Sequence, residues 1–151
     1  SPEIIDFLIK EHFKNNSDYT CAKEFAVGSS GEVYSVGSLE KSLSKTKKAS
    51  YSEYLPFYYM NNKKYFAITV SPLPKKFVGN HRLTLDFYED LKFFRKLFQK
   101  LKEERLKINL INIFKILRKN KEIDNINRNI KLIYRQNKFI KFLNKKNQFK
   151  N

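Results

Sequence analysis

The sequence predicts an α+β domain: a small antiparallel sheet, formed by a β-hairpin around residues 57–71, with an N-terminal helix and a long basic helical C-terminal extension. Two observations favour this class. Apolar residues recur at helical spacing near the N-terminus and again after residue 86, whereas two β-prone runs flank a polar turn at residues 61–64. With 151 residues the chain holds one modest core, and no apolar run is long enough for membrane insertion.

The first fifty residues are expected to hold a helix and then a loop. Ser1 before Pro2 marks a helix start, and the apolar spacing up to Phe13 predicts a helix over residues 2–14 within an N-terminal helical segment, 1–24. Residues 25–50 form a Gly/Ser-rich loop in this interpretation, with a brief strand at 32–36.

A compact core is expected over residues 51–88. An aromatic-rich run precedes the turn at residues 61–64, and a second β-prone run follows from Tyr65 to Val70. Such a pattern is typical of a hairpin, and Pro72 and Pro74 end its second strand.

Residues 89–151 are expected to form the basic helical extension. Asp86 and Glu89 can form a capping box, and apolar residues then follow at steps of four and three to Leu101. A second apolar stretch runs from Leu106 to Leu117. A heptad of isoleucines predicts a further helix over residues 123–140.

The charge of the chain points to a polyanionic partner. Lys and Arg outnumber Asp and Glu by 31 to 15, and residues 61–151 hold 24 of the basic side chains against 7 acidic ones. Phosphate backbones favour such surfaces through counterion release. Lys outnumbers Arg by 25 to 6, which indicates an AT-rich genome, so part of the charge reflects codon bias.

Catalytic motifs are sparse. Gly28 to Gly31 resembles the end of a kinase glycine-rich loop or the backbone clamp of a KH module, but the companion kinase motifs are missing and a linker explains it better. Cys21 has no histidine at a spacing that indicates a thiol–imidazole pair.

One acid and imidazole cluster remains, His81 with Asp86, Glu89 and Asp90, which a metal-dependent nuclease would use. Capping of the following helix accounts for its carboxylates. We therefore expect no enzyme, no catalytic residue, no metal and no cofactor.

The expected ligand is RNA. Its candidate contacts lie at the predicted turn, in the loop before the helix and on the basic helical faces: Asn61, Lys63, Lys64, Lys75, Lys76, Gly79, His81, Arg82, Lys92, Arg95, Lys96, Arg128, Lys131 and Arg135.

Two segments carry a family resemblance. Phe57 to Ser71 is similar to the strand, His-Asn-Gly-Lys-Lys turn and Val-rich strand of small-subunit ribosomal protein nineteen of the bacterial and organellar type. Phe77 to Phe87 is similar to that family's Met-Val-Gly-His-Lys-Leu-Gly-Glu-Phe segment, with Asn80 inserted. The family's basic N-terminal motif has no counterpart in residues 1–50.

The resemblance implies an α+β protein on ribosomal RNA in the head of the small subunit, beside small-subunit protein thirteen and other ribosomal proteins. By matching position, the RNA-facing turns would hold Asn61, Lys63, Lys64, Val78, Gly79, His81, Arg82 and Leu83.

The sequence-based hypothesis is therefore a structural subunit of an organellar, mitochondrial-matrix ribosome. The alternative is a soluble accessory subunit of a respiratory or other large mitochondrial complex, bound through its Ile- and Phe-rich helices. Another organelle, or the cytoplasm of an AT-rich organism, is the alternative location. A small nuclease ranks last.

Overall fold

The computed structural model describes residues 1–46, 51–130, 137–147 and 149, and they form two compact units. Unit 1 comprises residues 1–6, 22–31 and 72–130, and unit 2 comprises residues 7–21, 32–71 and 131–151. The chain passes between the units several times, so each unit is built from segments that lie far apart in the sequence. No helix in the described parts of the chain is both long and apolar enough to cross a bilayer.

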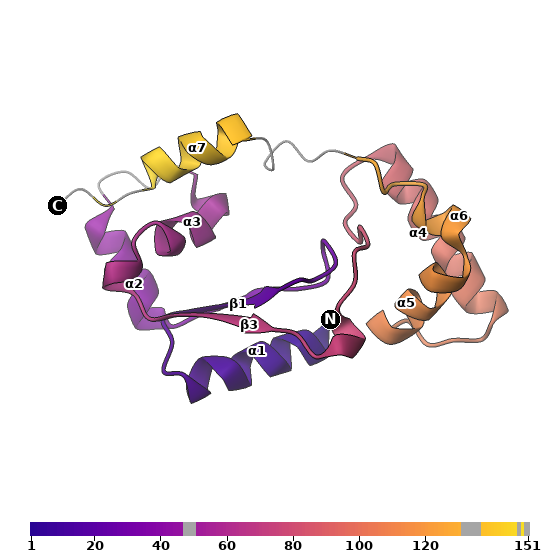
Figure 1. Ribbon diagram of the computed structural model, residues 1–151, viewed down its shortest axis with the longest axis horizontal. Helices are drawn as coiled ribbons and strands as arrows, with labels where there is room; N and C mark the ends of the chain where they lie inside the picture. The colour runs from indigo at the N-terminus through magenta and orange to yellow at the C-terminus, as the bar shows by residue number, and fades with distance from the viewer. Residues whose placement is uncertain (47–50, 131–136, 148, 150–151) are drawn as a thin grey trace. The chain divides into compact units, whose positions relative to one another are not determined.

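The α+β class is confirmed. In chain order the helices and strands are α1 (Pro2–Lys14), β1 (Tyr19–Lys23), β2 (Glu32–Tyr34), α2 (Val36–Lys45), α3 (Leu55–Met60), β3 (Ile68–Pro72), α4 (Tyr88–Glu103), α5 (Leu110–Lys119), α6 (Lys121–Asp124) and α7 (Asn137–Lys146) (Figure 1). Short 3-10 turns at Ser52–Tyr54, Lys63–Tyr65 and Lys75–Phe77 connect some of them.

The sheet has the strand order β2-β1-β3. β1 pairs antiparallel with β2, from Tyr19 opposite Tyr34 to Cys21 opposite Glu32, while β1 and β3 run in the same direction (Figure 1). The sheet is thus mixed, and the prediction of a purely antiparallel sheet is wrong. Side chains alternate along β1, so that Thr20 accepts or donates a hydrogen bond with His12 of α1 while Tyr19 faces an aromatic cluster.

That aromatic cluster is the core of unit 2. Tyr19, Tyr58, Tyr59 and Phe66 are buried together, and the rings of Tyr59 and Phe66 lie 4.4 Å apart. The predicted hairpin over residues 57–71 is wrong, because the aromatic run before the turn is helical and buries Tyr58 and Tyr59 as α3. Only the second run becomes a strand, and its partner is β1.

The Ser-rich segment contains a helix that the sequence does not predict. Ser35 caps α2 by accepting a hydrogen bond from the backbone of Ser38, and the buried hydroxyl of Ser38 bonds the backbone oxygens of Asp18 and Ser35. Serines at these positions therefore begin the helix and attach it to the core. The loop prediction is wrong for residues 36–45, while the short strand after Gly31 is confirmed.

Helices α4, α5 and α6 pack together in unit 1 (Figure 1). Their buried core consists of Phe93, Leu97, Leu101, Ile116, Leu117 and Ile123. The predicted helix after Asp86 is confirmed as α4, but its predicted apolar stripe is buried only in part. Leu101 lies in the core and Phe94 packs against it, whereas Leu91 and Phe98 line a surface groove. Phe93 and Leu97, which the stripe did not include, are fully buried.

The predicted isoleucine-rich helix over residues 123–140 is wrong in its described part, because α6 ends at Asp124 and turns follow to Ile130. The C-terminal residues belong to unit 2. There the buried side-chain amide of Asn62 donates to the backbone oxygen of Asn147, and its carbonyl oxygen accepts from the backbone of Phe149.

Candidate functional site

A buried ion pair lies at the start of α4 in unit 1. Arg82 donates from Nε to Asp90 Oδ1 and from Nη2 to Asp90 Oδ2, both at 2.8 Å. The Asp90 side chain is fully buried and that of Arg82 is 6% exposed. The two parallel bonds fix the plane of the guanidinium group against the carboxylate.

Asp90 accepts three further hydrogen bonds. Two come from the backbone N–H groups of Asp86 and Phe87 at the start of α4, each 3.0 Å long, and the third from the amide of Asn127 at 2.8 Å. Asn127 also donates to the backbone oxygen of Arg82. The predicted capping box of Asp86 with Glu89 is wrong, because Asp90 binds the helix start one residue later.

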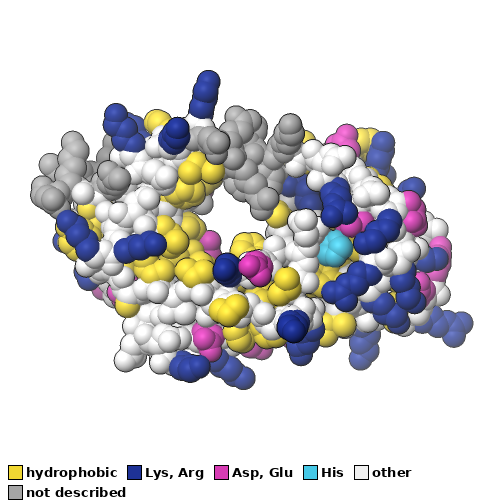
Figure 2. Space-filling view, viewed as in Figure 1, with side chains coloured by type: hydrophobic (Ala, Val, Ile, Leu, Met, Phe, Trp, Pro, Cys, Tyr) yellow, Lys and Arg dark blue, Asp and Glu magenta, His cyan; other side chains and the backbone are white. Residues whose placement is uncertain are grey.

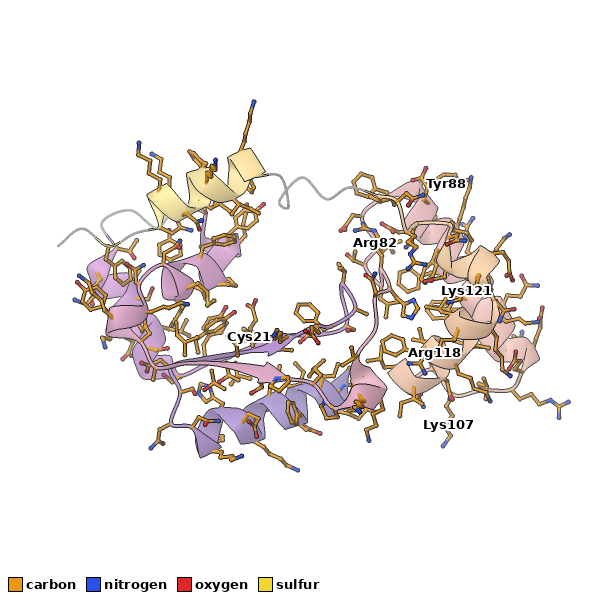
Figure 3. The ribbon with its side chains drawn as sticks, in the orientation of Figure 1. Cys21, Arg82, Tyr88, Lys107, Arg118 and Lys121 are labelled. Atoms are coloured by element: carbon orange, nitrogen blue, oxygen red, sulfur yellow. The ribbon has the colours of Figure 1, made fainter. Side chains whose placement is uncertain are left out.

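Asp86 connects this buried network to solvent. Its Oδ2 accepts from Arg82 Nη2 at 2.9 Å and from the Thr84 hydroxyl at 3.0 Å, yet half of the Asp86 side chain is exposed. The network therefore presents one accessible carboxylate in a fixed orientation. Figure 3 labels Arg82 beside the start of α4.

Backbone pairing places Arg82 in this network. Val27 forms a parallel bridge with Arg82, in which Val27 N–H donates to the His81 oxygen and Leu83 N–H donates to the Val27 oxygen. The next residue, Gly28, has φ +85°, and a Cβ there would lie 2.3 Å from the Leu83 oxygen. Gly28 thus serves the close approach of two backbone segments, rather than the linker role predicted for the Gly/Ser-rich run.

His81 points to the other side of the same segment. Its Nδ1 lies 2.6 Å from Asp124 Oδ1, and its ring lies 5.0 Å from that of Phe114. Arg128 reaches the second oxygen of Asp124 at 3.5 Å. The acid partner of His81 is therefore Asp124, and not the carboxylates at residues 86–90 that the nuclease interpretation requires.

Hydrogen bonding controls the charge of Asp90. Burial alone would raise the pKa of its carboxyl, but the bonds from Arg82, Asn127 and the backbone of Asp86 and Phe87 outweigh burial and lower the pKa from 3.8 to about 2. Asp90 is therefore a carboxylate throughout the ordinary pH range.

This shift predicts an acid-sensitive stability. The unfolded chain binds a proton at Asp90 before the folded chain does, so the free energy of unfolding should fall by about 2 kcal/mol as the pH drops from about 4 to about 2. Urea unfolding across this range measures the loss, and Asp90→Asn should remove that portion of the pH dependence. Glu103→Gln, at an exposed site, is the control. An unchanged acid profile in Asp90→Asn would contradict the prediction.

The fourteen predicted RNA contacts are divided between the two units: Asn61, Lys63, Lys64, Lys131 and Arg135 belong to unit 2, and the others to unit 1. Gly79 packs under the Phe114 and His81 rings, and Arg82 is used by its two carboxylate partners. Asn61 ends α3. Lys64, Lys76 and Lys92 lie over the rings of Tyr65, Phe77 and Tyr88. Lys63, Lys75, Arg95, Lys96 and Arg128 are exposed, while Lys131 and Arg135 lie outside the described residues.

The described residues contain neither a cluster of metal-binding side chains nor an activated thiol. Residues with placed side chains contain no group of three His, Cys, Asp or Glu arranged around an ion. Burial raises the pKa of the Cys21 thiol, which keeps it protonated and weakly nucleophilic.

The chain is similar in sequence to curated proteins of an archaeon and a bacterium. It is 30% identical over 132 residues to an uncharacterised protein of Methanocaldococcus jannaschii, covering 87% of this chain and 54% of that protein. It is 31% identical over 104 residues to the spore coat polysaccharide biosynthesis protein SpsF of Bacillus subtilis, covering 68% of this chain and 43% of SpsF. The chain thus spans about half the length of the curated relatives it matches.

The fold is similar to part of a solved cytidylyltransferase structure. The solved structure of a cytidylyltransferase from Leptospira borgpetersenii matches with a TM-score of 0.68 and 20% identity, over 86% of this chain and 54% of that one. No family profile matches the chain.

These similarities correct the functional hypothesis. A ribosomal subunit, its ribosomal RNA and protein thirteen as partners, and the absence of enzymatic activity were wrong predictions, and the accessory-subunit alternative finds no support either. The resemblance to ribosomal protein nineteen rested on a strand–turn–strand pattern whose first arm is helix α3. Mitochondrial location stays a prediction.

The functional network was partly visible in the sequence. Arg82, Asp86 and Asp90 lie close together in the sequence, just before and within the first turn of the predicted helix, so that a contact between these opposite charges is short-range. The sequence alone favours helix caps for the carboxylates and an RNA contact for the arginine. No sequence pattern predicted the contacts of Asn127 and Asp124, because both residues lie far along the chain from Asp90 and His81.

Proposed function

We propose that this chain forms part of a nucleotidyltransferase that transfers a cytidylyl group from CTP to an acceptor in polysaccharide biosynthesis. The observation that carries the proposal is the fold shared with a cytidylyltransferase over 86% of this chain. Similarity to the polysaccharide biosynthesis protein SpsF supports it and indicates the class of pathway. Because the chain spans about half of these proteins, the activity is proposed for the whole enzyme.

The chemistry needs groups that control charge on phosphate. An acceptor oxygen attacks the α-phosphorus of CTP, the bond to the β-phosphate oxygen breaks, and pyrophosphate leaves with its electron pair. Negative charge on the phosphoryl oxygens is then stabilised by fixed cations or a divalent ion. Buried Arg82 is occupied by Asp90 and Asp86, so its role in this proposal is to position Asp86.

Asp86 fits the ion that accompanies a nucleoside triphosphate. Mg²⁺ is usually bound by one or two carboxylates together with substrate phosphates, and Asp86 is half exposed with one oxygen fixed by Arg82 and Thr84. When bound, the ion would neutralise phosphate charge. The chain orients the Asp86 carboxylate through its bonds from Arg82 and Thr84, and the two bonds from Arg82 to buried Asp90 hold the guanidinium group in place.

Nucleotide titrations test this function. Calorimetry should show that the protein binds CTP more tightly than UTP, ATP or GTP in the presence of Mg²⁺. Asp86→Asn should weaken Mg²⁺-dependent CTP binding by about tenfold, because one anionic ligand is lost. Glu89→Gln, an exposed acid three residues away, is the matched control. Equal affinity for all four nucleotides, or equal losses in both variants, would contradict the proposal.

A further inference from the structure

The His81–Asp124 pair has no role in the network around Asp86. The His81 side chain is 9% exposed and that of Asp124 is 3% exposed. A carboxylate that bonds Nδ1 of an imidazole fixes the orientation of the ring, and Nε2 then faces away from the carboxylate. Such an arrangement orients a histidine toward a ligand. Burying a histidine and a carboxylate also lowers the stability of the fold unless both side chains form hydrogen bonds.

The surroundings of this histidine are strongly basic. Arg118 lies with its guanidinium carbon 6.0 Å from the centre of the Phe114 ring, the same ring that packs against His81. Arg128 approaches the other oxygen of Asp124. Residues 105–121 contain six Lys and Arg and no Asp or Glu.

The pictures agree with these contacts. Figure 2 shows many Lys and Arg side chains on the part of the molecule that holds α4, α5 and α6, with a histidine side chain visible among them. Figure 3 labels Arg118 and Lys121 on α5 and α6 in that region. All of these residues belong to unit 1, so their arrangement does not depend on unit 2.

We propose that His81, Arg118 and Arg128 form a binding site for a phosphate-type oxyanion. Guanidinium groups bind such anions through two parallel hydrogen bonds, and a protonated imidazole adds a donor at Nε2. The negative charge of Asp124 repels an anion. Its carboxylate already accepts a hydrogen bond from His81 and lies close to Arg128, so we place the anion on the side of His81 that faces away from Asp124. The proposal is independent of the transferase activity, since free phosphate and the phosphate of a larger ligand share this chemistry.

The two histidines of the chain allow a direct test. In protein labelled with ¹⁵N-histidine, phosphate is titrated at constant ionic strength while the ring resonances are recorded by NMR. The His81 ring resonances should shift saturably as phosphate binds. His12, buried in unit 2 against Thr20, is the internal reference and should not move. Linear or equal movement of both rings would overturn the site.

Variants that remove one positive charge each distinguish a specific phosphate site from non-specific attraction to the basic surface. Arg118→Gln and Arg128→Gln should each weaken phosphate binding by about tenfold. Lys96→Gln removes the same charge from the exposed face of α4 and should leave the affinity within about twofold. Equal weakening in all three variants would overturn the proposal.

A parallel titration with CTP identifies the source of the phosphate. A His81 response at lower concentrations of CTP than of inorganic phosphate assigns the site to the nucleotide, and the reverse order assigns it to free phosphate; both results support an oxyanion site. No response of His81 to either compound would overturn it, even if calorimetry shows CTP binding elsewhere.

Discussion

Replacing Arg82 with methionine is expected to lower the free energy of unfolding by about 3–5 kcal/mol. The substitution keeps most of the side-chain volume but leaves the Asp90 carboxylate fully buried without its cation. A buried charge that loses its partner carries the whole cost of its desolvation. Urea unfolding at pH 7 measures this effect.

The matched control is Arg95→Met, which makes the same chemical change at an exposed position of the same helix α4. It should change stability by less than about 0.5 kcal/mol. The double variant Arg82→Met/Asp90→Leu should be more stable than the sum of the single effects predicts, because no unpaired charge remains. Additive losses would show that the two residues do not act as a pair.

Replacing Gly28 with alanine is expected to cost about 3 kcal/mol. A residue with a Cβ is strained at φ +85°, and the added methyl group would lie 2.3 Å from the Leu83 oxygen and 3.0 Å from the Thr84 nitrogen. Both contacts are to backbone atoms, so relief requires the Val27–Leu83 pairing to separate. Thermal and urea unfolding of the variant measure the cost.

Gly37→Ala is the control, because it is expected to raise the free energy of unfolding and not to lower it. Gly37 lies in α2, its φ is not positive, and a Cβ added there would meet no atom within 4 Å. Alanine there should stabilise the protein by up to about 1 kcal/mol through its helix propensity. If Gly28→Ala proved as harmless as Gly37→Ala, the close backbone approach at Gly28 would be refuted. Because this approach positions Arg82, the proposed function also predicts weaker CTP binding in Gly28→Ala.

The spacing of apolar residues along the sequence predicted the helices whose ends and buried faces are set by neighbouring residues. The helix over residues 2–14 and the long helix after Asp86 follow from capping and apolar spacing. The failures at α2 and α3 have a physical cause. Ser38 is buried because its hydroxyl finds backbone oxygens, and Tyr58 and Tyr59 are helical because the aromatic cluster of unit 2 covers them. Tertiary contacts decided both segments.

The site was less predictable than the fold. Net charge indicated a polyanion, but it does not show which cations are paired inside the protein. Arg82 is neutralised by two carboxylates, and Lys76 and Lys92 lie over aromatic rings. Counting charges along the sequence therefore does not show that Arg82 is buried and paired, whereas Lys76 and Lys92 stay exposed. Asp124, the partner of His81, and Asn127, one of the partners of Asp90, lie about forty residues away from them in the sequence.

The bonds between Asn62 and residues 147 and 149 have a consequence for how the protein forms during translation. Asn62 emerges from the ribosome more than eighty residues before its partners, so its amide stays hydrated until they arrive. Unit 2 therefore does not mature in the order of synthesis. In an interrupted nascent chain the Asn62 amide nitrogen keeps its bond to the Tyr58 oxygen, but its carbonyl oxygen lacks the donor from the backbone of Phe149.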